Sequence, residues 1–164
     1  MLVKSLLDSD MKKGLQESIY LELYQSNLWK SLANQLQKAG LFGSQKYFLA
    51  ESAEELTHYQ MIVEFMNDMG DCASLPKIDA ITDKASTIGD ALQIGYETEL
   101  NVYNHYKDFA KECLKSDLAV YAFIEQFVNI QREAVGHYGD LLAKYKIAEE
   151  TKEILEFDEH ISDL

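Results

Sequence analysis

The chain has few of the residues that interrupt or cross-link a fold. Its 164 residues include one proline, eight glycines and two cysteines, while 47% are hydrophobic. This composition is typical of a compact globular protein and argues against a disordered, fibrous or disulfide-built one. Cys72 and Cys113 form no CxxC unit and no disulfide framework, which indicates a reducing compartment.

Long apolar runs and positive charge are also scarce. No run approaches the roughly 18 residues that a membrane span needs, and residues 1–10 lack the apolar region and small-residue cleavage site of a signal peptide. We therefore expect a cytoplasmic protein.

Lys and Arg number 15 against 28 Asp and Glu, so the formal net charge is −13. This charge argues against nucleic acid or an anionic membrane as a partner and suits the attraction of cations.

Apolar residues recur at helical spacing along most of the chain. Glycines in the segment 39–43 end the first helical stretch, and Ser44 is expected to cap the second. Ser116 or Asp117 is expected to cap the fourth. A shorter amphipathic segment with 3-4-3 apolar spacing closes the sequence. The predicted helices span about residues 7–37, 44–69, 87–114 and 118–145, followed by a short helix at about 150–162.

Residues 71–86 contain the only proline and no sustained helical period, so they are predicted to form a long connection. In a helix bundle such a connection usually carries the chain back to the end from which it came. The short connections before and after it place the helices of each pair antiparallel. We therefore predict one all-α domain over residues 1–164, a four-helix bundle with a long crossover and a short C-terminal fifth helix.

A carboxylate and an imidazole lie three residues apart in the second helical stretch. Glu55 and His58 therefore share a helix face and can bind one metal ion together. The apolar stripes of the other three long helices are also interrupted by polar residues. Because burying a lone carboxylate costs several kcal/mol, a core layer with three of them needs a compensating cation. A pair of divalent metals supplies it, and oxygen ligands with one imidazole suit iron or manganese. The interrupting residues are Glu22, Glu55 with His58, Glu99 and Gln131.

The sequence resembles the non-haem bacterial ferritins over nearly its whole length, including the helix lengths, the crossover and the short terminal helix. The most specific segments are Leu21-Glu22-Leu23-Tyr24, Ala53-Glu54-Glu55-Leu56-Thr57-His58 and Gln131-x-Glu133. The resemblance implies a ferritin-like bundle with a di-iron centre. Glu22, Glu55 and His58 would bind the first iron, with Glu55 as the bridge. Glu99 and Glu55 would bind the second iron, and Gln131 would lie beside it.

By the same resemblance the protein is a ferroxidase that stores and detoxifies iron. Two Fe²⁺ per subunit would be oxidised by O₂ or H₂O₂, and the ferric product would mineralise inside a homo-oligomeric cage. The fifth helix favours a 24-subunit cage, because large ferritin cages have such a helix and simple bundles lack it.

Three departures from the ferritin pattern qualify this expectation. Trp29 stands where ferritins usually place a tyrosine, so it either packs against the site or serves as a different electron donor. Glu54 and Glu133 match a third iron position, but Ile130 and Ala134 stand where further carboxylates would be expected, so that position is the weaker one. Leu56 replaces the methionine with which bacterioferritins bind haem, so no haem is expected.

Two other functions are compatible with a helical bundle. The first is a non-storage di-iron oxidase or peroxidase of the rubrerythrin type, although the sequence lacks a second Glu-x-x-His and a cysteine-rich iron site. The second is a metal-free helical scaffold in which the polar core residues only fix the helix register. His105 and His137 have no evident acidic partner on the same helix face, and we expect surface or core roles for them. His160 lies beside Asp158 and Glu159 in the terminal helix, where we expect a solvated face, with a ring at an oligomer axis as the alternative.

Overall fold

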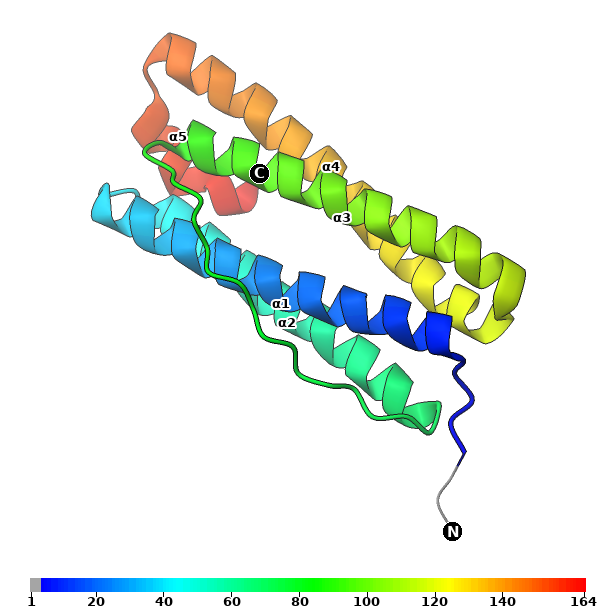
Figure 1. Cartoon of the computed structure of the whole chain (residues 1–164). Helices are drawn as coiled ribbons and strands as arrows, with labels where there is room; N and C mark the ends of the chain where they lie inside the picture. The colour runs from blue at the N-terminus through cyan, green and yellow to red at the C-terminus, as the bar shows by residue number, and fades with distance from the viewer. Residues whose placement is uncertain (1–3) are drawn as a thin grey trace.

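The computed structural model describes residues 4–164, and all regular secondary structure in this range is helical (Figure 1). Four long helices pack as two pairs, α1 with α2 and α3 with α4, and α1 also contacts α3. The predicted all-α four-helix bundle with a fifth helix is confirmed. The helices are α1 (Ser9–Lys38), α2 (Phe42–Asp68), α3 (Ile88–Ser116), α4 (Leu118–Thr151) and α5 (Ile154–His160), followed by a 3₁₀ turn at Ile161–Asp163. Within residues 4–164 no helix is both long enough and apolar enough to cross a membrane.

Side-chain caps define several helix ends. The Asp8 carboxylate accepts hydrogen bonds from the backbone of Asp10 and Met11 and starts α1, two residues later than predicted. Thr87 and Asp90 form a reciprocal capping box at the start of α3. Asp117 caps α4, as the sequence predicts. Gly40 and Gly70, which follow α1 and α2, both have positive φ, the conformation that ends a helix and that glycine adopts without strain.

The predicted end of the fourth helix is wrong by six residues. Helix α4 continues to Thr151, and the last turns carry Tyr145 and Ala148 into an apolar cluster. Tyr145 packs edge-on against Phe157 of α5, with ring centroids 5.5 Å apart. The extension is therefore stabilised by contacts with α5, which begins at Ile154 instead of about residue 150. The end of α3 likewise lies at Ser116, two residues past the prediction.

The predicted cap of the second helix is also wrong. Ser44 lies inside α2 and is buried, and the N-cap residue Leu41 has no side-chain hydrogen bond to offer. The cap comes from α5, where the Asp158 carboxylate accepts hydrogen bonds from the backbone N–H groups of Gly43 (3.0 Å) and Ser44 (2.8 Å). A Cβ at Gly43 would lie 1.7 Å from the Asp158 carbonyl oxygen. Only glycine at position 43 therefore allows this close approach.

The long connection between α2 and α3 lies in an extended conformation along the bundle (Figure 1). Side chains of α1 hold it. Gln16 accepts from the Ser74 backbone N–H, the Tyr20 hydroxyl donates to Asp79, and Gln35 accepts from the Ala85 N–H while donating to a backbone carbonyl nearby. The crossover is thus fixed by polar contacts to one helix instead of by its own secondary structure.

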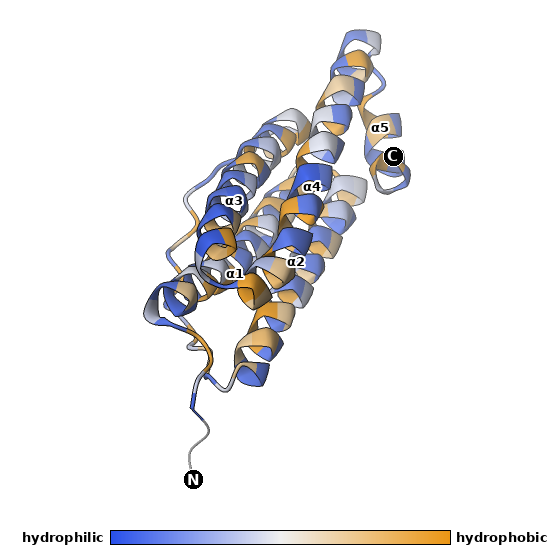
Figure 2. Cartoon of the chain, turned by 90° about the vertical axis from the view of Figure 1, so that its right-hand side faces the viewer, coloured by the Kyte–Doolittle hydropathy of each residue, from blue (hydrophilic) through white to orange (hydrophobic). Residues whose placement is uncertain are grey.

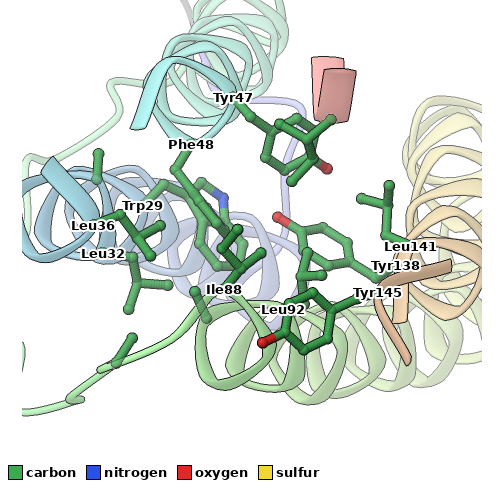
Figure 3. Close-up of a cluster of buried hydrophobic side chains, with 14 of the residues drawn as sticks. Trp29, Leu32, Leu36, Tyr47, Phe48, Ile88, Leu92, Tyr138, Leu141 and Tyr145 are labelled. Atoms are coloured by element: carbon green, nitrogen blue, oxygen red, sulfur yellow. The ribbon is translucent and has the colours of Figure 1, made fainter. Parts of the chain in front are cut away.

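The core consists of two apolar clusters, one toward each end of the bundle, and apolar and polar residues alternate around the long helices (Figure 2). The cluster near α5 includes Trp29, Phe48 and Tyr138, whose side chains point toward one another (Figure 3). The other includes Ile19, Tyr106 and Phe127. Along each long helix, buried polar residues lie between the members of these clusters. The fold therefore places a polar layer near the middle of an otherwise apolar core.

We predict that Asp158→Ala lowers the free energy of unfolding by about 1–2 kcal/mol, the usual effect of losing a helix N-cap. Urea unfolding followed by circular dichroism would measure it. Glu159→Ala is the matched control, because Glu159 is exposed on the same helix. Equal stability of the two variants would contradict a capping role for Asp158.

A second prediction concerns Asp71, which joins the end of α2 to the start of α1. Its carboxylate contacts Lys12 Nζ at 2.6 Å and accepts from the Cys72 N–H and the Ser5 hydroxyl. The hydrogen bond from Lys12, followed by that from the Cys72 N–H, lowers the pKa of Asp71 to about 2. Because the folded pKa lies below the unfolded value of 3.8, this stabilisation is present above about pH 4 and is lost as the pH falls toward 2.

Asp71→Asn should therefore destabilise the protein by about 1 kcal/mol at pH 7. The difference from the parent protein should shrink as the pH is lowered from 4 toward 2. Urea midpoints of both proteins across this range measure the difference directly, and a constant difference would rule out an ionic contribution from Asp71.

Candidate metal centre

The polar layer contains the five residues that the sequence predicts for the di-iron centre. They come from the four long helices, and each side chain is buried, with exposed fractions between 0% and 7%. Four of them line a single cavity of about 350 Å³, and the fifth, Glu22, lies directly beside His58. The four residues in the cavity wall are Glu55, His58, Glu99 and Gln131.

Three of these groups form a tight cluster. Glu22, Glu55 and His58 each offer one ligand atom, and the three atoms all lie within 4.8 Å of one another. His58 Nδ1 lies 3.0 Å from Glu55 Oε2 and 3.4 Å from Glu22 Oε2. The i, i+3 spacing on α2 brings Glu55 and His58 together, as expected, and the packing of α1 against α2 adds Glu22. Two carboxylates and one imidazole at this separation can hold a divalent cation.

Neutral hydrogen-bond donors orient both carboxylates of the cluster. The Trp29 indole N–H donates to Glu55 Oε1 at 3.0 Å, and the Tyr106 hydroxyl donates to Glu22 Oε1. Such contacts to metal-binding carboxylates fix their direction. Trp29 is fully buried between Phe48 and Tyr138, at ring-centroid distances of 5.9 and 5.8 Å (Figure 3). Trp29 therefore packs beside the site, which is one of the two roles considered from the sequence. Its indole N–H also contacts the site through Glu55.

Several buried oxygen atoms of the layer have no hydrogen-bond partner among residues 4–164, although one of them, Glu22 Oε2, lies 3.4 Å from His58 Nδ1. They are Glu22 Oε2, Glu99 Oε2 and Gln131 Oε1. Leaving a buried acceptor unsatisfied costs about 1–3 kcal/mol, and more for a charged group. A cation in the cavity would give these oxygens a common partner. The donor set is thus one that a divalent metal fits.

Burial keeps protons in this layer while no cation is bound. It is the largest influence on Glu22, whose pKa is raised to about 8, and it also raises the pKa of Glu99 well above its ordinary value. For His58, burial opposes the charged form, but the adjacent Glu22 and Glu55 carboxylates outweigh it and raise the pKa to about 10. A metal ion that bound here would replace protons as the positive charge of the layer.

Two exposed carboxylates also line the cavity. Glu54 and Glu133, the residues of the weaker third position, line it together with Ile130 and Ala134. Both glutamates are exposed, and Glu54 Oε1 lies 3.9 Å from His58 Nε2. Neither belongs to the three-residue cluster. The third position therefore stays a prediction.

Glu51 is a member of the cavity wall that sequence reasoning missed. It accepts a hydrogen bond from the Tyr138 hydroxyl at 3.2 Å, and burial raises its pKa to about 7. The sequence signal that could have identified Glu51 is its position four residues before Glu55, on the same face of α2. Among the other histidines, His137 lines the cavity, whereas His105 contacts Ser18 at 3.0 Å outside the cavity wall.

Comparison with known proteins identifies the same architecture. Residues 12–148 match a family model described as the ferritin-like domain. The probable bacterial non-heme ferritin-like protein of Haemophilus influenzae is 22% identical over 161 residues, which cover 97% of this chain and 98% of the relative. The soma ferritin of Lymnaea stagnalis is 27% identical over 143 residues, which cover 84% and 82%. The open pore ferritin of Archaeoglobus fulgidus superposes with a TM-score of 0.90 at 24% identity, over 95% of this chain and 98% of that one, and so has the same fold.

We predict that Glu99→Gln stabilises the metal-free protein by about 1–3 kcal/mol, because a buried carboxyl whose Oε2 lacks a hydrogen-bond partner is replaced by an amide that carries no charge. Chemical denaturation in the presence of a chelator would show this. Glu97→Gln, at an exposed position of α3, should stay within about 0.5 kcal/mol of the parent. A loss of stability in Glu99→Gln would contradict the interpretation of Glu99 as an uncompensated buried acid.

Proposed function

The chain belongs to the ferritin-like domain family, and on that premise we propose that it stores and detoxifies iron by oxidising Fe²⁺ at the buried polar layer. One observation carries the proposal. Three carboxylates and an imidazole from three helices are buried in the core, and two of the carboxylates have an oxygen that lacks a hydrogen-bond partner among residues 4–164. A metal-free scaffold would keep these destabilising groups without a use for them.

The proposed iron ligands follow the geometry of the layer. Glu22, Glu55 and His58 bind the first iron, and Glu55 bridges to the second. Glu99 holds the second iron, with Gln131 beside it. Two Fe²⁺ therefore bind per chain. The net charge of −13 and the exposed carboxylates that line the cavity raise the local concentration of Fe²⁺ near this site.

The electrons released by Fe²⁺ oxidation are balanced when either O₂ or H₂O₂ is the electron acceptor. Two Fe²⁺ lose one electron each, and O₂ with two protons takes both electrons to give H₂O₂. Alternatively, H₂O₂ with two protons takes them to give two water molecules. The protein contributes the negative charge that favours Fe³⁺ over Fe²⁺ and holds the two metal positions close together. The indole N–H of Trp29 keeps the bridging Glu55 in place.

Storage requires a shell, and the surface of α2 supports self-association. Phe42, Leu49 and Leu56 repeat every seven residues on one face of this helix, with exposed fractions of 57%, 42% and 40%. Exposed apolar residues aligned on one helix face are typical of an interface. We propose that this stripe is buried between subunits of a homo-oligomeric cage of 24 chains. Both cysteines are free, which is consistent with the cytoplasm as the compartment.

The test is to load metal-free protein with Fe²⁺ without air, admit air, and follow ferric absorbance together with particle mass. We expect rapid oxidation of about two Fe²⁺ per chain, followed by continued uptake into a particle of constant protein mass. Glu55→Gln should slow the first phase at least tenfold, since it removes the bridging carboxylate. Glu64→Gln, at an exposed position on the same helix, is the matched control.

The outcomes separate the three candidate functions. A small oligomer that oxidises about two Fe²⁺ per chain and takes up no more would contradict storage and favour a di-iron oxidase. A protein that binds no Fe²⁺, and in which Glu55→Gln changes only stability, would support the scaffold instead.

A further inference from the structure

Two stacked aromatic rings connect the proposed iron site with a carboxylate outside the ligand set. Trp29, the only tryptophan of the chain, donates its indole N–H to Glu55 at 3.0 Å. Its ring lies nearly parallel to that of Tyr138 on α4, with 5.8 Å between the centroids and 21° between the planes (Figure 3). The Tyr138 hydroxyl in turn donates to Glu51 at 3.2 Å. These contacts lead without interruption from Glu55 to Glu51.

The packing of the bundle holds the two rings in this arrangement. Both are fully buried in the apolar cluster near α5, so neither can turn away without disturbing the core. A Cβ at Gly95 of α3 would lie 2.2 Å from the Tyr138 ring, so glycine at this position allows the ring to lie close to the helix. Tyr138 is therefore fixed by contacts with the three other long helices, through Gly95, Trp29 and Glu51.

The two rings differ in the base that is available to each. A strong oxidant can remove one electron from either tyrosine or tryptophan. An oxidised phenol is a strong acid, and its proton leaves readily when a base lies within hydrogen-bond reach. Glu51 is such a base for Tyr138. The hydrogen-bond acceptor of Trp29 is Glu55, which in the proposed function binds both irons and is not free to take a proton. An oxidised state that reaches this pair should therefore remain on Tyr138.

We propose that Tyr138 is a one-electron donor to the iron site, with Trp29 as the relay between them and Glu51 as the acceptor of the phenol proton. The inference rests on the proposed function, because the oxidant forms at the iron site. It applies when H₂O₂ meets a chain that holds a single Fe²⁺, which can provide only one of the two electrons that H₂O₂ accepts.

The atoms and electrons of this step balance. H₂O₂ takes two electrons and two protons from solvent, its O–O bond breaks, and two water molecules form. One electron comes from Fe²⁺, which becomes Fe³⁺. The other comes from Tyr138 by way of Trp29, while the phenol O–H bond breaks and its proton passes to the Glu51 carboxylate. Tyr138 becomes a neutral radical, and no hydroxyl radical leaves the site.

The test mixes H₂O₂ with protein that carries a single Fe²⁺ per chain, freezes the sample rapidly and records the electron paramagnetic resonance signal per iron oxidised. In the parent protein the signal should narrow with ring-deuterated tyrosine and be unchanged with ring-deuterated tryptophan. Tyr138→Phe keeps the stacked ring and removes the hydroxyl. In this variant the radical should stay on Trp29, so that the signal responds to deuterated tryptophan instead.

Glu51→Gln tests the proton acceptor separately from the electron donor. The amide cannot take the phenol proton, although its oxygen can still accept the hydrogen bond from Tyr138. The tyrosyl signal should fall by about tenfold or more, since a positioned proton acceptor contributes about 10²–10⁴-fold to a rate. A residue with only a packing role would not change which ring carries the radical.

Tyr47→Phe is the matched control. The Tyr47 ring is also buried, and it lies edge-on to Tyr138 with 6.3 Å between the centroids. Its hydroxyl, however, has no hydrogen-bond partner among residues 4–164. The size of the signal and its response to deuteration should equal those of the parent.

Three results would overturn the inference while the proposed function stands. The first is a parent signal that responds only to deuterated tryptophan, which would place the radical on Trp29. The second is a tyrosyl signal that persists in Tyr138→Phe or is lost in Tyr47→Phe, which would place it on another tyrosine. The third is oxidation of the iron without any protein radical. If the parent neither binds nor oxidises Fe²⁺, the proposed function fails, and the role of Tyr138 fails with it.

Discussion

The cost of burying carboxylates between two apolar clusters governs this structure. Glu22, Glu55 and Glu99 lie in the core, where an isolated charge is strongly disfavoured and a neutral acid still needs hydrogen bonds. The protein meets part of this need with Trp29, Tyr106 and His58. It leaves the rest unmet, since oxygens of Glu22 and Glu99 lack partners within residues 4–164. A layer of this kind lowers stability in the absence of metal and provides the free energy for binding a cation.

The surrounding fold holds that layer at a defined place. The apolar clusters on either side close the layer toward both ends of the bundle and hold its side chains in place. The crossover is held to α1 by Gln16, Tyr20 and Gln35, which carry no metal-binding role. At one end, α5 supplies the cap of α2 through Asp158. The terminal helix is therefore part of the support of the bundle.

The comparison with ferritins and the local geometry answer different questions. The family match covers most of the chain and establishes the architecture, but identities of 22–27% do not assign individual residues. The assignment of the site residues therefore rests on the burial of the polar side chains and on the distances between them. Trp29 illustrates the point, because its indole N–H contacts Glu55 whether or not the residue takes part in electron transfer.

The sequence by itself determined the helical architecture, the crossover and the set of polar residues that interrupt the apolar stripes. These follow from periodicity, because a helix repeats its faces every three to four residues and Glu55 and His58 need only their own helix to meet. Only the tertiary structure decided which groups complete each contact. The cap of α2 by Asp158 and the added turns of α4, which pack against α5, depend on residues distant in the sequence. Such contacts leave no periodic signal, so packing alone assigns them.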